Sequence, residues 1–156
     1  MLKLLKKRLK NEKGLTLIEV LAVVVILAIV AMIAIPAIGN LIENNRIKAI
    51  KADAINVISA AQIYYTDGGE EKFGEKIGNT TKIKGEDYVQ NFGSISKDGL
   101  TVTRDGKISA TGTKGNVTIK FGNESSGASI EDIKAEEAKA GSNIEIRVDG
   151  SKIYPN

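Results

Sequence analysis

Residues 15–66 contain two stretches in which the apolar residues follow different patterns. Residues 15–38 are apolar except for Thr16 and Glu19. In residues 40–66 the apolar side chains instead recur every three or four positions, which predicts an amphipathic helix with one buried face. The residues of that face are Ile47, Ile50, Ala54, Ile58, Ala61 and Tyr65.

The two stretches are expected to form one helix. No polar break separates them, so the helix should run from about Leu15 to about Thr66, where Asp67-Gly68-Gly69 would end it. Pro36 removes one helical hydrogen bond and Gly39 has low helix propensity, so the two together predict a weak point. A simple proline kink is the alternative, because membrane helices often tolerate proline.

Residues 67–156 alternate β-prone runs with turns that contain glycine. Asp105-Gly106 and Asp149-Gly150 are strong hairpin signals, and Gly115-Asn116 is a further turn signal. Ser129 and Asp132 form a capping signal for a short helix, which Gly141 would stop. The expected strands are 88–92, 100–104, 107–111, 117–121, 144–148 and 152–154. The predicted fold is α+β: a long N-terminal helix whose second half packs on a small four- or five-stranded antiparallel sheet.

The apolar stretch is long enough to cross a membrane. A helix of its length spans about 36 Å, against a bilayer core of about 30 Å. The basic side chains before it should hold its N-terminus in the cytoplasm. They are Lys3, Lys6, Lys7, Arg8, Lys10 and Lys13. A cleaved secretory signal fits less well, since its apolar region is shorter and ends at a small-residue cleavage site. A plain single-pass anchor is a second alternative.

Charge and composition narrow the function classes. Residues 1–14 contain a single acid, Glu12, and carry a net charge of +5. The net charge of the whole chain is +3, so the remaining residues are slightly acidic, which weakens a nucleic-acid interpretation. The chain has no cysteine and no histidine, which excludes disulfides, thiolate metal sites and histidine general bases. Asp98, Asp105 and Asp149 precede glycines as in ordinary turns, without the alternating acids of a calcium loop. We therefore expect no enzyme, metal or cofactor.

Glu19 requires a separate explanation. A carboxylate inside an apolar membrane segment costs roughly 2.5–3.5 kcal/mol and usually has a partner. The apolar stretch holds no cation. A cut between Gly14 and Leu15 would create an ammonium on Leu15, one helical turn before Glu19 on the same face. Cleavage would thus supply the missing cation, on the same subunit or on a neighbour.

Residues 13–22, KGLTLIEVLA, resemble the processing motif of the type IV pilin and pseudopilin family. The resemblance covers residues 1 to about 65 and includes the basic class III-type leader. It implies that a prepilin peptidase cuts after Gly14, that Leu15 becomes the N-methylated first residue, and that Glu19 is the buried carboxylate that sets filament register. Pro36 falls where the family usually has a helix-weakening proline. One departure is Leu15, since the first mature residue in the family is most often Phe.

The resemblance also implies an organisation and a set of partners. Residues 1–14 would be a cleaved leader, 15–39 a transmembrane and filament-core helix, 40–66 its amphipathic half, and 67–156 an exported β-rich region. The subunit would sit in the cytoplasmic membrane before assembly and in a surface pilus afterwards. Its partners would be identical subunits, the prepilin peptidase, the assembly platform and minor pilins. With the absence of cysteine, the resemblance favours a Gram-positive source.

Three functions remain open at this point. A pilin would polymerise into a filament for adhesion, twitching motility or aggregation. A pseudopilin would serve a competence or type II-like secretion apparatus, and only in the competence case would DNA be a partner. A membrane-tethered binding module that never assembles is the third, and it leaves Glu19 and the Gly14 junction unexplained.

Overall fold

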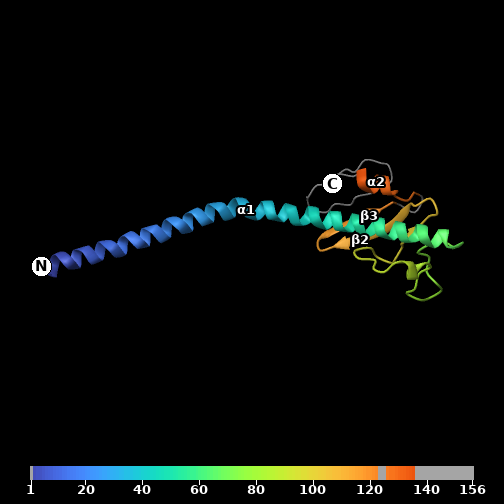
Figure 1. Cartoon of the computed structure of the whole chain (residues 1–156), viewed down its shortest axis with the longest axis horizontal. Helices are drawn as coiled ribbons and strands as arrows, with labels where there is room; N and C mark the ends of the chain where they lie inside the picture. Colours follow the sequence, from blue (N-terminus) through green and yellow to red (C-terminus); the bar gives the residue numbers. More distant parts are fainter. Residues whose placement is uncertain (1, 123–125, 136–156) are drawn as a thin grey trace. The chain divides into compact units, whose positions relative to one another are not determined.

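The computed structural model describes residues 2–122 and 126–135, and for residues 2–16 the backbone alone. The chain divides into two units, Met1–Asn40 and Leu41–Asn156. One helix, α1 (Leu2–Thr66), runs through the first unit and into the second (Figure 1). α1 begins earlier than the expected start near Leu15. The leader is rich in leucine, lysine and arginine, which favour helix, and Gly14 alone does not interrupt it.

Within the first unit, the residues that the structure describes form helix alone. None of the described side chains from residue 17 to residue 42 is buried. Pro36 lies inside α1, which continues through it. By length and composition, α1 is able to cross a membrane, although those two criteria are also met by signal sequences.

The expected end of α1 at Thr66 is confirmed. The amide of Asp67 donates to the carbonyl of Ile63 at 2.9 Å, and the amide of Gly69 donates to the carbonyl of Tyr64 at 3.0 Å. Between them Gly68 has φ 94°, a left-handed conformation that glycine adopts without strain. This combination closes the last turn in the manner of a Schellman motif.

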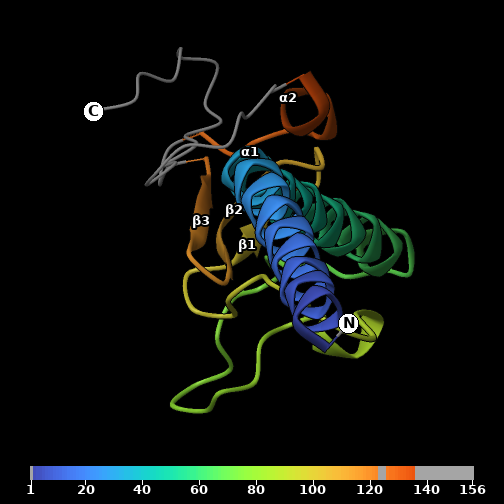
Figure 2. The same cartoon turned by 90° about the vertical axis from the view of Figure 1, so that its left-hand side faces the viewer.

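The second unit contains a three-stranded antiparallel sheet in the order β1-β2-β3. Its strands are β1 (Thr101–Val102), β2 (Ile108–Lys114) and β3 (Val117–Phe121), which Figure 2 shows side by side. The prediction for β3 is confirmed to the residue. β1 is shorter than expected, and β2 runs three residues further than expected. The expected strands 144–148 and 152–154 lie outside the described residues, as does Gly141.

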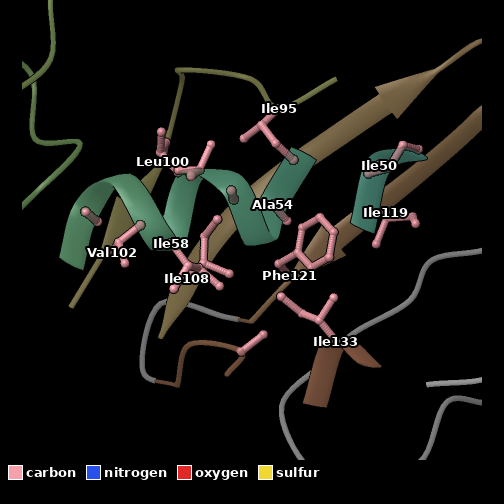
Figure 3. Packing of buried hydrophobic residues seen from close by; sticks show 14 of the residues in the cluster. Ile50, Ala54, Ile58, Ile95, Leu100, Val102, Ile108, Ile119, Phe121 and Ile133 are labelled. Carbon is pink, nitrogen blue, oxygen red and sulfur yellow. The ribbon is translucent and has the colours of Figure 1, made fainter. Parts of the chain in front are cut away.

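The amphipathic half of α1 packs on one face of this sheet. Ile50, Ala54 and Ile58 point from the helix toward side chains of β2 and β3, among them Ile108 and Phe121 (Figure 3). The buried stripe is the predicted one with two changes: Val57 and Ala60 are also buried, and Tyr65 is only half-buried. The remaining buried cluster residues are Ile47, Ala61, Phe73, Ile83, Ile95, Leu100, Val102, Ala110, Val117, Ile119, Ala128 and Ile133.

Gly112 lies within β2 at a point where a side chain of α1 comes close to the strand. A Cβ built on Gly112 would lie 2.4 Å from Cγ2 of Ile50 and 3.0 Å from Cδ1 of Ile95. Gly112, which follows the expected strand 107–111, is therefore a strand residue whose missing side chain leaves room for Ile50.

The connection from α1 to β1 contains no regular strand, and the expected strand 88–92 is wrong. A 3₁₀ turn, η1 (Glu86–Tyr88), begins there instead, after Gly85 in a left-handed conformation. The Glu86 carboxylate accepts the amide of Ile83 at 3.1 Å and the Lys97 ammonium at 2.9 Å, which fixes this turn. Local side-chain bonds have thus replaced β pairing.

The short helix that the capping signal predicts is confirmed as α2 (Ile130–Ala135). The Ser129 hydroxyl accepts the amide of Asp132 at 3.2 Å, and the Asp132 carboxylate accepts the Ser129 amide at 2.9 Å. These reciprocal bonds make a capping box, with Asp in the place usual for Glu. The buried side chain of Ile133 joins α2 to the core.

Candidate processing and assembly site

The candidate site is built on one continuous stretch of α1. Gly14 and Leu15 have helical backbone, so the peptide bond between them lies within the helix of the full chain. Glu19 follows Leu15 by four residues, which is about 6 Å along the helix axis. Leu15 and Glu19 therefore share a face of the helix, as the spacing predicts.

Glu19 is electrostatically isolated in the described part of the chain. It is the only ionisable residue between Leu17 and Ile42, and its side chain is exposed. Among the described residues it takes part in none of the ion pairs, all of which lie in the second unit. A single carboxylate on an otherwise apolar, uncovered surface is the arrangement expected of a group whose partner is supplied by another molecule or by a later covalent change.

The two residues of the expected weak point differ in their surroundings. Pro36 leaves α1 continuous, so the helix of the isolated chain is not broken there. A Cβ added to Gly39 would meet no atom within 4 Å. Packing within the described structure does not require glycine at this position, and its low helix propensity is its remaining local effect.

Several hydrogen bonds that organise the second unit were not predicted from the sequence. The Tyr65 hydroxyl donates to the carbonyl of Val102 at 2.7 Å and accepts the amide of Phe73 at 2.9 Å, so it joins α1 to two other segments. The Asp53 carboxylate accepts the amide of Ser94 at 2.8 Å. No signal in the sequence gave these pairings, since each joins residues whose proximity depends on the fold.

The rings of Tyr64 and Tyr65 pack against each other at the end of α1, and the Tyr64 ring also packs against further aromatic side chains. The Tyr64 ring lies edge-to-face against Tyr65, Phe73 and Tyr88, with ring centroids 5.3, 5.7 and 5.5 Å away. A Cβ on Gly69 would lie 2.4 Å from the Tyr64 ring, so backbone covers that ring closely. The aromatic rings of this cluster thus pack against one another.

Taken together, these features define a class of chain with an apolar, uncovered N-terminal helix, a basic leader and a small α+β unit. Residues 9–35 match the family model of the prokaryotic N-terminal methylation motif, the class III leader of type IV pilins and pseudopilins. No curated protein and no solved structure gave a significant match. The motif supports a type IV pilin-like or pseudopilin-like prepilin, a structural subunit rather than an enzyme.

The motif also implies processing and assembly. Chains that carry it are substrates of prepilin peptidase and assemble into pilus-like polymers. The apolar part of α1, together with the leader, fits membrane anchoring before assembly and a place in a surface pilus afterwards.

Proposed function

We propose that the chain is the precursor of a type IV pilin that is cut after Gly14, N-methylated on Leu15 and polymerised through residues 15–38 into a surface filament. The observation that carries this proposal is the uncovered apolar surface of α1 over residues 17–35, which lies within the matched motif and is interrupted only by Glu19. Such a surface can be buried first in lipid and then against identical helices. The filament would serve adhesion, surface motility or aggregation.

The cut at Gly14 is tested on the protein from its native cell. The mature chain should begin at Leu15 and lack the 14 leader residues, with N-methylation adding about 14 Da (a methyl group replaces one hydrogen on the new amine, a net gain of CH₂). Intact-mass measurement of membrane and filament fractions decides this. A bulky charged residue in place of Gly14 should leave the leader attached, whereas a mature N-terminus at any other residue would refute the assignment.

Glu19 is proposed to set the stagger between subunits through the ammonium of Leu15. The carboxylate burdens membrane insertion, and it gains a cation only after cleavage and packing. Glu19→Ala should therefore insert as well as the parent chain, be cut after Gly14, and be depleted from filaments. Glu19→Gln keeps the shape without the charge and separates electrostatics from packing. Normal filaments from Glu19→Ala would show that the carboxylate has another role.

Pro36 and Gly39 are proposed to let α1 unwind locally when subunits pack. Because there is open space at Gly39, Gly39→Ala adds helix propensity without a clash, worth about 1 kcal/mol. The substitution should stiffen this part of α1 and lower the yield of filaments while the second unit stays folded. Unchanged filament yield would favour a proline kink that persists through assembly.

A pseudopilin of a competence or secretion apparatus is the alternative within the same family, because the motif is common to both. Electron microscopy of surface filaments from the native cell separates the two. Long filaments containing this subunit support a pilin, and their absence from cells that process the chain normally supports a pseudopilin.

A further inference from the structure

The turn between β2 and β3 holds α1 by side-chain hydrogen bonds. The Asn116 amide nitrogen donates to Oε1 of Glu43 at 2.8 Å, and its Oδ1 accepts a hydrogen bond from Nη1 of Arg46. Glu43 and Arg46 are three residues apart and so lie on one face of the helix. One amide therefore binds an acceptor and a donor that belong to the same turn of α1.

The geometry of this contact requires glycine at position 115 and asparagine at position 116, the two residues of the turn. Gly115 has φ 64°, and a Cβ there would lie 2.7 Å from Cζ of Arg46. The guanidinium thus packs directly over the backbone of the turn, where a larger residue would displace it. Asn116 must offer one donor and one acceptor at once, which neither aspartate nor alanine can do.

The contact lies at the beginning of the part of α1 that packs in the second unit. Moving from Leu17 toward the C-terminus, the first buried side chain is Ile47, at 2% exposure. Glu43 and Arg46 are only partly covered, and Asn116 is exposed. The hydrogen bonds of Asn116 therefore attach α1 to the β2–β3 turn about one helical turn before the first buried side chain of the helix.

We propose that Asn116, with Gly115, Glu43 and Arg46, forms a clamp that sets the limit of helix unwinding in α1. This inference rests on the proposed unwinding at Pro36 and Gly39. Unwinding that begins there would pass through Asn40 and stop at Glu43, because opening the next turn requires breaking both bonds to Asn116. Asn116 is thus a positioning residue that keeps the sheet in fixed register with the helix while the segment before it changes conformation.

Asn116 also begins one of three tripeptides of the Asn-x-Ser/Thr glycosylation type in the sequence. The side-chain amide that a glycan would occupy is already bonded to Glu43. Asn79 begins another such tripeptide and lies exposed in the loop between Ile77 and Lys82. It offers a matched control, since Asn79→Ala removes the same side chain at an exposed position away from α1.

The test is hydrogen exchange of the full chain in detergent, followed by mass spectrometry of peptides. Asn116→Ala should raise exchange in residues 41–47 by about threefold, as expected for the loss of two partly exposed hydrogen bonds. Exchange in residues 54–61, within the buried part of α1, should not change. Asn79→Ala should leave both segments as in the parent chain.

An exchange of donor and acceptor provides a rescue. Asn116→Asp should also raise exchange in residues 41–47, because it places a second carboxylate beside Glu43. When Asn116→Asp is combined with Glu43→Gln, the new amide at position 43 can donate to one oxygen of the new carboxylate at position 116. The other oxygen of that carboxylate accepts from Arg46, so protection of residues 41–47 should return. A merely structural effect of changing the turn would not be reversed by a substitution on the helix.

Three outcomes would overturn the clamp: unchanged exchange in Asn116→Ala, an equal rise throughout the second unit, or failure of the double variant to restore protection. The measurement needs no filament, so it can fail while the Glu19 and mass tests succeed. Conversely, loss of the proposed pilus function would leave the local protection by Asn116 intact.

Discussion

The amphipathic half of α1 should be indispensable to the folding of the second unit. A fragment of residues 40–156 retains this half and lacks the apolar stretch, and we expect it to unfold cooperatively. A fragment of residues 68–156 loses four large buried side chains, Ile47, Ile50, Val57 and Ile58. At about 1.5–3 kcal/mol each, their loss removes roughly 6–12 kcal/mol, comparable to the whole stability of a small domain at about 5–15 kcal/mol.

Urea unfolding followed by far-UV circular dichroism distinguishes the two fragments. A matched pair of substitutions in the longer fragment tests the same reasoning side by side. Ile58 is fully buried, and Ile63, five residues later in the same helix, is 59% exposed. Ile58→Ala should cost about 2–5 kcal/mol and Ile63→Ala close to nothing. Cooperative unfolding of the 68–156 fragment, or equal effects of the two substitutions, would refute the helix-on-sheet account of stability.

Three further substitutions test contacts of the second unit. Gly112→Val should lower the free energy of unfolding by about 2 kcal/mol or more, measured in urea, because its side chain would overlap Ile50. Tyr65→Phe leaves a carbonyl and an amide without their partner and should cost about 1–3 kcal/mol, seen as a lower melting temperature. Hydrogen bonding from the Ser129 backbone amide, and then from its hydroxyl, lowers the pKa of Asp132 below its usual value. A lowered pKa means that this carboxylate stabilises the fold above its unfolded pKa, and that the contribution is lost as pH falls through the folded pKa. Asp132→Asn should therefore reduce stability at neutral pH and flatten its loss in acid, measured by melting from pH 7 to pH 2.

Local signals in the sequence predicted the elements whose determinants lie close together in the chain. The three-residue periodicity of Ile47, Ile50 and their neighbours gave the buried stripe, and the turn residues after Thr66 gave the end of α1. The pair Ser129 and Asp132 gave α2. The helix end and α2 depend on hydrogen bonds within one or two turns, and the stripe shows in the sequence as a helical period although it packs on distant strands.

Two kinds of contact account for what the sequence could not predict. The expected strand 88–92 had an adequate pattern, but local side-chain bonds of Glu86 to Ile83 and Lys97 hold a 3₁₀ turn over Glu86–Tyr88 instead. β2 extends past residue 111 because it pairs with β3 as far as Lys114, which lies opposite Val117. For the candidate site, the spacing of Gly14, Leu15 and Glu19 could be predicted from the sequence alone, and their roles in cleavage and register stay predictions.

The helical backbone around Gly14 has a consequence for what cleavage would produce. A cut inside a helix exposes the first amides of the remaining segment, which lose their carbonyl partners in the leader. These amides and the aligned peptide dipoles make the new end of α1 a positive pole, in addition to the ammonium of Leu15. Glu19 would then lie about one helical turn from this positive end, on the same face as Leu15. Removal of a leader that carries +5 would in this way exchange a diffuse basic segment for a single concentrated charge at the tip of the helix.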